Sequence, residues 1–309
     1  MTMPSSPTEG PIVVTGGSGF VGRALISYLT ELGIPQRDIS LRPSGDQPAL
    51  SGINDGRGWA HLLTGAQTVI HLAGRAHVMK ETNRNPLELF RDANLNTSIR
   101  IANAAVLAGV KRLVFVSTVK VHGEFTEPGT AFKADDPLAP VGPYAVSKVE
   151  AEFALRKIEA ETGLEVVIVR PTLVYGPGAK GNMVRIQRWA ELGLPSPFSN
   201  VKNLRSRVHV ANLCDLLLLA ARHPNARGRS FLASDGIDVS THAMLEEAFF
   251  ARGKKPMELP FPSGFWSVMK RLPKLDEIHQ KLFLNLQADI EDTRSILGYQ
   301  PVSRTLFPR

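Results

Sequence analysis

Two side chains at helical spacing are the first candidates for chemistry. Tyr144 and Lys148 follow Gly142-Pro143 and stand four residues apart. Residues four apart share one face of a helix, so the phenol and the ammonium can reach the same point. A free tyrosine has a pKa of about 10, and a neighbouring lysine cation stabilises the phenolate and lowers that pKa. The pair therefore predicts a group that exchanges a proton at neutral pH.

A glycine-rich turn near the N-terminus predicts a site for phosphate groups. Gly16, Gly19 and Gly22 follow the apolar run 12–14 and open a helical pattern that starts at Phe20. In such a series the first glycine permits the turn, the second lets the backbone approach a pyrophosphate, and the third lets helix and strand pack closely. The helix N-terminus favours the negative charge. A purely structural turn is the alternative, but the position between a first strand and a first helix favours dinucleotide binding.

The residue beside the adenosine ribose distinguishes the two nicotinamide dinucleotides. An acidic residue about 20 positions past the glycines binds the 2′-hydroxyl of NAD. Here the expected strand Ile39–Leu41 is followed by Arg42. Arginine suits the 2′-phosphate of NADP by charge and bidentate geometry. We expect NADP(H) to be preferred and NAD(H) to be possible, and a solvated arginine at a strand end is the alternative interpretation.

The elements that position these groups alternate between strand and helix up to residue 170. This alternation predicts an α/β fold, a Rossmann-type doubly wound parallel sheet with a smaller C-terminal substrate-binding domain. We expect the dinucleotide-binding domain to comprise residues 1–171 plus about 205–240, and the substrate domain 172–204 plus 241–309. The expected strands are 12–14, 39–41, 68–72, 112–117, 166–169 and 230–232, and the main expected helices are 20–32, 86–108, 144–162, 182–192 and 209–221.

The charge distribution restricts the class of partner. The 309 residues carry 36 basic and 29 acidic side chains, and the whole excess of +7 lies after residue 170. No run of like charge and no basic–aromatic alternation accompanies it, so nucleic acid is not expected. A slightly basic solvated surface and a site for an anionic small molecule both explain the excess.

Other classes of protein lack support in the sequence. The longest apolar run, Leu213–Ala221, contains Asp215 and is too short for a membrane span. No signal peptide is visible, and a single cysteine, Cys214, agrees with a reducing cytoplasm. Eight histidines occur without a metal-binding motif, so no metal site is expected.

Together these motifs resemble the short-chain dehydrogenase/reductase superfamily. Within it, the chain is similar to the extended branch of nucleotide-sugar epimerases, dehydratases and reductases, the NAD-dependent epimerase/dehydratase family. The resemblance covers nearly the whole chain. It also rests on 71–74, Asn94, 116–118, Arg170-Pro171, 174–178, 205–210 and 297–299.

The resemblance implies roles for individual residues. Tyr144 is the expected proton donor or acceptor, Lys148 its partner at the nicotinamide ribose, and Thr118 the third catalytic residue. His122 stands where the family has a tyrosine. The expected substrate contacts are Thr118, Asn182 and Arg205. The expected cofactor contacts are Gly16, Gly19, Phe20, Val21, Gly22, Arg42, Leu72, Ala73, Gly74, Asn94, Ser117, Tyr144, Lys148 and Pro171.

The implied activity is oxidation or reduction at carbon 4 of a nucleotide-diphosphate hexose. A UDP-4-keto-6-deoxy-sugar reductase is favoured because Arg42 indicates NADPH, and a UDP-sugar 4-epimerase is the alternative. Dehydratases usually have an acidic residue after the catalytic Ser or Thr, and Val119 stands there instead. A dinucleotide sensor without catalysis is a further alternative, although such proteins typically lose the tyrosine or the lysine. The family also implies a homodimer formed by the helices 86–108 and 144–162, and synthesis of bacterial surface polysaccharide.

Overall fold

The computed structural model describes residues 10–39, 56–76, 85–179, 182–259 and 279–304. The chain forms two compact units, each built from separate stretches. The first contains Met1–Ser117, Gly142–Val169 and Cys214–Phe231, and the second contains Thr118–Val141, Arg170–Leu213 and Leu232–Arg309. The loop 118–141, included in the dinucleotide domain by the sequence prediction, thus packs with the second unit.

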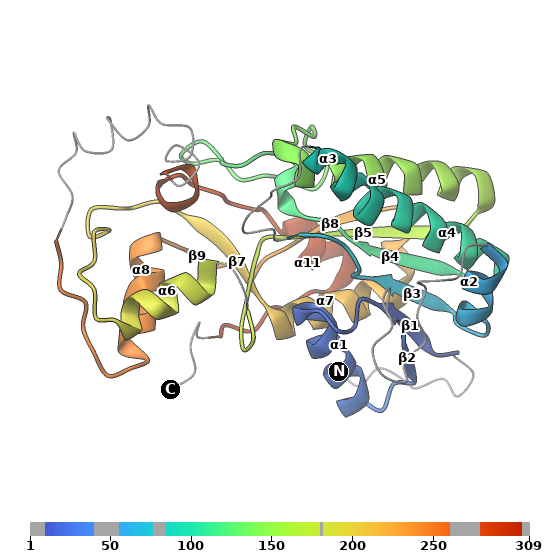
Figure 1. Ribbon diagram of the computed structural model, residues 1–309, viewed down its shortest axis with the longest axis horizontal. Helices are drawn as coiled ribbons and strands as arrows, with labels where there is room; N and C mark the ends of the chain where they lie inside the picture. Colours follow the sequence, from blue (N-terminus) through green and yellow to red (C-terminus); the bar gives the residue numbers. More distant parts are fainter. Residues whose placement is uncertain (1–9, 40–55, 77–84, 180–181, 260–278, 305–309) are drawn as a thin grey trace. The chain divides into compact units, whose positions relative to one another are not determined.

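A six-stranded sheet with the order β2-β1-β3-β4-β5-β8 organises the first unit (Figure 1). All four resolved pairings from β2 to β5 are parallel, as the alternation predicted. The chain runs from β1 outward to β2 and then returns to β3 on the other side of β1. This reversal is the position where ligands bind in open α/β sheets. The strands are β1 Ile12–Thr15, β2 Gln36–Ile39, β3 Thr68–His71, β4 Arg112–Val116, β5 Glu165–Pro171 and β8 Ser230–Ala233.

Helices cover both faces of this sheet. Figure 1 shows α4 (Thr97–Leu107) and α5 (Gly142–Thr162) on one face, and α1 (Phe20–Glu31) and α7 (Val210–Arg222) on the other. The inner strands β1 and β3 are buried along their whole length because both faces of the sheet are covered, whereas the edge strand β2 has the polar sequence Gln-Arg-Asp-Ile and is mostly half-buried. One core cluster joins α2 (Gly56–Leu63), α4 and α5 to the sheet, and it includes the fully buried Ile101, Phe115 and Leu155.

A buried ion pair joins two strands to a helix end in this unit. Arg112 and Glu165 are register partners on β4 and β5, and the guanidinium lies 2.7 Å from the carboxylate. The same guanidinium donates hydrogen bonds to the carbonyls of Ala220, Ala221 and His223. These are carbonyls at the C-terminal end of α7, which have no partners within the helix. The pair therefore positions α7 against the strand edge.

The segment expected to be one helix over 86–108 is interrupted. It consists of α3 (Pro86–Phe90), a π-helical segment η1 (Arg91–Asn96) and α4. A π-helical turn leaves an extra residue in the helix and often marks a functional position. Here it contains the buried Asn94, one of the expected cofactor contacts.

The second unit is built on a smaller sheet with the order β6-β7-β9. Strands β6 (Leu173–Tyr175) and β7 (Arg205–His209) are parallel, and β9 (Asp238–Val239) is antiparallel to β7. Helices α6 (Asn182–Glu191) and α8 (Thr241–Phe250) share a separate core with Tyr175 and Phe198. The C-terminal helix α11 spans Glu291–Leu297. In the part of the chain that is described, no helix has the length and apolarity to cross a membrane.

Candidate functional site

The glycine loop between β1 and α1 is shaped by backbone contacts that exclude side chains. Gly16 has a φ of +82°, and a Cβ there would lie 2.7 Å from the backbone nitrogen of Ala73. A Cβ on Gly22 would lie 2.2 Å from the carbonyl oxygen of Gly16. Gly19, by contrast, is exposed, and its nearest such contact is 3.2 Å away. Packing therefore explains two of the glycines, whereas at Gly19 the absent side chain leaves the backbone open to a ligand.

The N-terminus of α1 opens at the same loop. Its N-cap is Gly19, and no side chain caps the helix. Phe20 and Val21 form the first turn. The first N–H groups of an uncapped helix lack partners within it and favour a negative charge. The loop thus presents backbone donors where a phosphate could accept.

Asp38 is a polar contact of this loop that the sequence reasoning missed. Its carboxylate accepts a hydrogen bond of 3.2 Å from the backbone N–H of Gly17. A Cβ on Gly17 would lie 2.2 Å from the same carboxylate oxygen, so a side chain there would displace Asp38 from the loop. The expected strand began at Ile39, but β2 already includes Asp38, which brings the carboxylate to the loop. Arg42, the expected NADP contact, lies outside the described residues.

Lys148 is a buried cation in the first unit. Lys148 is only 5% exposed, and its Nζ donates a 2.8 Å hydrogen bond to the carbonyl of Val116. Nζ also lies 4.3 Å from the ring centroid of Phe115, which favours the cation. Burial lowers the pKa of Lys148 to about 8, and the charge of Glu152 partly opposes that effect. The ammonium is therefore charged at neutral pH but releases its proton more readily than an exposed lysine.

A hydrogen-bonded chain links the glycine loop to the π-helical segment. His71 bonds Thr15 through Nδ1 at 2.6 Å and Ser98 through Nε2 at 3.0 Å. Burial, followed by the charge of Lys148, lowers the pKa of His71 to about 3, so the ring is neutral. The Ser98 hydroxyl donates to the carbonyl of Asn94, so Nε2 must donate to Ser98 and Nδ1 must accept from Thr15. One tautomer thus satisfies the whole chain.

Asn94 connects this chain to the helix that carries Tyr144 and Lys148. Its amide nitrogen donates to Ser147 Oγ at 2.9 Å and to the carbonyl of Arg75, while its oxygen accepts from the Arg75 N–H. Ser147 in turn donates to the carbonyl of Tyr144. A Cβ on Gly74 would lie 2.7 Å from the Asn94 amide oxygen. The π-helical turn therefore holds Asn94 between two segments of the expected site.

The remaining expected residues of the first unit lie on the same strand ends and helix. Tyr144 is half-buried, and its ring lies 6.1 Å from that of Phe90. Ser117 follows β4 and is 3% exposed, and its backbone N–H bonds the carbonyl of Val169. The Ser117 hydroxyl has no hydrogen-bond partner among the described residues. Leu72 follows β3, and its N–H bonds the carbonyl of Thr15.

The expected substrate residues belong to the second unit. Thr118 is buried and caps a short 3₁₀ turn, accepting from the N–H of Lys120 at 3.3 Å. Asn182 begins α6, and Pro171, an expected cofactor contact, ends β5. Arg205 opens β7 and donates a 2.9 Å hydrogen bond to the carbonyl of Leu284. Burial lowers the pKa of Arg205 to about 10, against the effect of Glu124, and the guanidinium stays charged.

His122, which replaces the family's tyrosine, has its own set of partners. Its Nε2 lies 3.0 Å from the guanidinium of Arg170, and its ring stacks on Phe132 at 5.4 Å. An arginine can only donate, so His122 accepts through Nε2. Arg170 also donates to the carbonyl of Ala134. Arg170 thus joins His122 to the loop at Ala134 within the second unit.

Comparison with known proteins found relatives that cover most of the chain. Residues 12–233 match the profile of the NAD dependent epimerase/dehydratase family. A UDP-glucose 4-epimerase of Vibrio cholerae is 38% identical over 296 residues, covering 94% of this chain and 90% of that protein. An N-acetyl-alpha-D-glucosaminyl-diphospho-ditrans,octacis-undecaprenol 4-epimerase of Escherichia coli O157:H7 is 26% identical over 263 residues, covering 82% of this chain and 76% of that protein.

A solved structure shares the fold. The structure of MoeE5 in complex with UDP-glucuronic acid and NAD has a TM-score of 0.75 and 24% identity, and the match covers 96% of this chain and 95% of that one. The family match spans more than two thirds of the sequence and includes the glycine loop, Asn94, Tyr144 and Lys148. The chain is therefore an enzyme of the NAD dependent epimerase/dehydratase family, within the short-chain dehydrogenase/reductase superfamily.

Proposed function

We propose that this enzyme interconverts a hydroxyl and a keto group at carbon 4 of a nucleotide-diphosphate sugar. The observation that carries the proposal is the buried, charged Lys148 on the same helix face as Tyr144, one turn away. A buried cation is costly and is retained where its charge is used. The V. cholerae and E. coli relatives, both named as 4-epimerases, support this reaction class.

The residues present fit a nicotinamide dinucleotide. The exposed Gly19 and the uncapped start of α1 suit a pyrophosphate, and the bare Ser117 hydroxyl is a buried polar group that a ligand could satisfy. Lys148 and Asn94 would hold the nicotinamide end. When bound, the dinucleotide supplies hydride transfer. Support comes from the bound NAD in the MoeE5 structure, while a preference for NADP rests on Arg42 alone.

In this proposal Tyr144 moves the proton and Lys148 supports it. The phenol donates a proton to the C4 oxygen in the direction of reduction and accepts one in the direction of oxidation. The ammonium of Lys148 favours the phenolate, so that the proton can leave at neutral pH. Thr118 would contact the C4 oxygen, and Asn182 and Arg205 would contact the diphosphate. An arginine fork binds two phosphate oxygens at once.

The finer activity is either reduction or epimerisation. We favour a UDP-4-keto-6-deoxy-sugar reductase using NADPH, because Arg42 suits a 2′-phosphate. A UDP-sugar 4-epimerase is the second candidate, and the V. cholerae relative favours it. Both activities use Tyr144 and Lys148 in the same way, so these residues do not discriminate between them.

The deciding experiment offers both substrates to the purified full-length chain. Incubation of NADPH with a UDP-4-keto-6-deoxy-hexosamine should consume one equivalent of reduced nicotinamide per sugar if the enzyme is a reductase. NMR of UDP-glucose or UDP-N-acetylglucosamine without added cofactor should reveal the C4 epimer if it is an epimerase. Tyr144→Phe is the control, because it removes the proton donor, which typically contributes about 10²- to 10⁴-fold. Turnover that survives this change would refute the assigned role.

We also propose that the chain is a homodimer formed through α4 and α5. Leu107 on α4 is 65% exposed, and Phe153 on α5 is 63% exposed. Contiguous exposed apolar patches mark protein–protein interfaces, and these two side chains are the candidates for such a patch on α4 and α5. Light scattering should give twice the chain mass of 33.7 kDa, and Phe153→Glu should return the monomer. A cytoplasmic location stays a prediction.

A further inference from the structure

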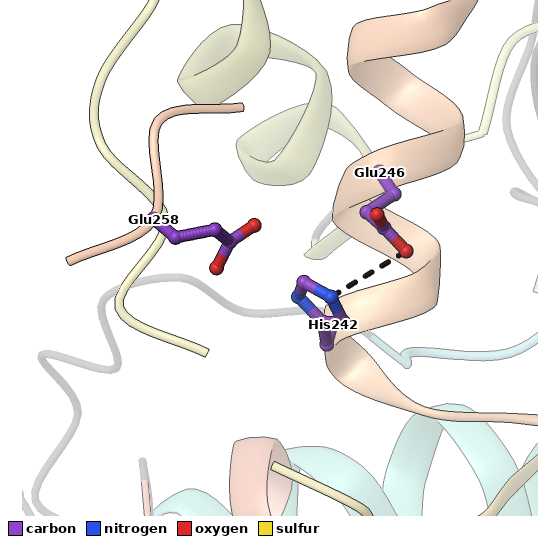
Figure 2. Close-up of side chains that lie close together, drawn as sticks. All are labelled: His242, Glu246 and Glu258. Carbon is purple, nitrogen blue, oxygen red and sulfur yellow. Dashed lines mark ion pairs between the residues drawn. The ribbon is translucent and has the colours of Figure 1, made fainter. Parts of the chain in front are cut away.

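Three side chains able to bind a metal gather in the second unit. They are His242, Glu246 and Glu258, and one potential ligand atom from each lies within 4.8 Å of the others. Figure 2 shows the imidazole of His242 between the two carboxylates. None of these residues belongs to the glycine loop, the Tyr144–Lys148 pair or the expected substrate contacts.

Local structure brings the three groups together. Ser240 caps α8 by accepting a 2.9 Å hydrogen bond from the N–H of Ala243, and this sets the start of the helix. His242 and Glu246 follow four residues apart and therefore share a face. Glu258 comes from an extended segment that pairs with Ser196. The Ser196 N–H donates a 2.7 Å hydrogen bond to the carbonyl of Met257, and the Leu259 N–H donates a 3.0 Å hydrogen bond to the carbonyl of Ser196. Two separate backbone elements thus converge on one point.

The two nitrogens of the His242 imidazole have different surroundings. Nδ1 of His242 is inaccessible to water and has no hydrogen-bond partner in the described chain. The other nitrogen, Nε2, lies 3.5 Å from a Glu246 carboxylate oxygen. A single ion binds only one ring nitrogen, and Nε2 is the nitrogen whose distance to a carboxylate oxygen suits a shared ion, so Nδ1 keeps the ring proton. Neither Glu246 nor Glu258 forms an ion pair with a lysine or arginine anywhere in the described ranges.

We propose that His242, Glu246 and Glu258 bind a divalent transition-metal cation of the zinc class. Zinc bonds imidazole nitrogen and carboxylate oxygen at about 2.0–2.2 Å, so two ligands of a tetrahedral ion stand roughly 3.4 Å apart. The 3.5 Å between His242 and Glu246 matches this edge. Glu258 is exposed, and its side chain can move the last ångström without disturbing the core. Water completes the coordination, and the two carboxylates neutralise the ion.

The bound ion joins α8 to the segment around Glu258. The sequence contains no known metal-binding motif at this site. His242 and Glu246 are not accompanied by a second histidine at regular spacing, and Glu258 lies twelve residues after Glu246. The proposed ion has no part in the reaction at C4. Its test therefore uses binding and stability, and does not depend on the substrate.

The test uses tag-free, chelator-treated full-length protein titrated with zinc chloride in a calorimeter. We expect one ion per chain with a Kd of about 10 µM or lower. His242→Ala should weaken zinc binding at least about 100-fold. Loss of a residue that only hydrogen-bonds a metal ligand typically weakens metal affinity by about 10- to 100-fold. Glu258→Gln and Glu246→Gln should each weaken it at least about tenfold. Zinc at 100 times the wild-type Kd should raise the Tm of the wild type by about 5 °C, and the rise should be about half as large in a variant with tenfold weaker binding and near zero in His242→Ala.

Two substitutions serve as matched controls. His61→Ala removes an exposed imidazole, and Glu127→Gln removes an exposed carboxylate, neither of which belongs to the cluster. Both should bind zinc like the wild type. If His242→Ala does not fold, Glu258→Gln tests the same site at an exposed position. Absence of saturable binding up to 1 mM zinc, or equal binding by wild type and Glu258→Gln, would overturn the proposal.

Discussion

Replacing Lys148 with methionine should stabilise the protein while removing its activity. The folded state holds the ammonium in a buried position, where its pKa is about 8 instead of 10.5. At 1.36 kcal/mol per pKa unit, this difference corresponds to roughly 3 kcal/mol. The lost hydrogen bond to the Val116 carbonyl offsets about 1 kcal/mol of that gain. We therefore expect Lys148→Met to be about 2 kcal/mol more stable than the wild type at pH 7.

The extra stability of Lys148→Met over the wild type should decrease as the pH rises. Below pH 8 Lys148 is charged in both states, and the folded wild type bears the full cost of burial. Between pH 8 and 10.5 the unfolded chain keeps a proton that the folded chain has released, so the wild type becomes relatively more stable as pH rises. Above 10.5 the lysine is neutral in both states and the cost is gone. The advantage of Lys148→Met should fall to near zero at pH 9.5.

Urea unfolding of both proteins at pH 7 and pH 9.5 measures this difference directly. Titrating groups remote from Lys148 are common to the two proteins and cancel. Lys157→Met is the control, because Lys157 lies on the same helix and its side chain is 75% exposed, so its replacement should change stability by less than about 0.5 kcal/mol. The reasoning would be refuted if Lys148→Met were less stable than the wild type at pH 7, or if the difference in free energy of unfolding were the same at both pH values.

Three further substitutions test other parts of the structure. Gly22→Ala should cost about 1–3 kcal/mol of stability in urea unfolding and weaken NAD binding in calorimetry, because its Cβ would overlap the Gly16 carbonyl. Arg112→Met should cost about 3–5 kcal/mol in urea unfolding, because it leaves the Glu165 carboxylate buried without its partner; a loss below 1 kcal/mol would contradict this. Arg205→Ala should raise the KM for the nucleotide sugar at least about tenfold while leaving NAD affinity unchanged, and Arg205→Lys should recover only part, since lysine lacks the bidentate fork. An unaltered KM would mean that the diphosphate is bound elsewhere.

The sequence predicted the architecture well because burial leaves a clear pattern. Strands covered on both faces are short apolar runs, and each expected strand from β3 to β5 lies within one or two residues of its observed bounds. The NAD dependent epimerase/dehydratase family was also correctly predicted, since the glycine loop and the Tyr144–Lys148 spacing are local motifs. The roles assigned to individual residues stay predictions.

The sequence did not predict the features that depend on contacts between distant segments. The π-helical segment 91–96 has an ordinary helical composition, and only the bonds of Asn94 to Arg75 and Ser147 distinguish it. Asp38 resembles a solvent-exposed residue until β2 places it beside Gly17. His242 and Glu258 are sixteen residues apart, with no regular spacing between them, so their proximity follows from folding alone.

The discontinuous course of the chain has a consequence for synthesis on the ribosome. The first compact unit requires residues from Met1 to Phe231, because its last stretch begins at Cys214. The glycine loop, Asn94 and the Tyr144–Lys148 helix leave the ribosome well before β8 and the end of α7. Until that last stretch emerges, the outer edge of β5 lacks β8, and Arg112 has Glu165 but lacks the carbonyl partners at the end of α7. The nascent chain therefore exposes an open strand edge, which is prone to pairing with other chains, until the residues up to Phe231 have been made.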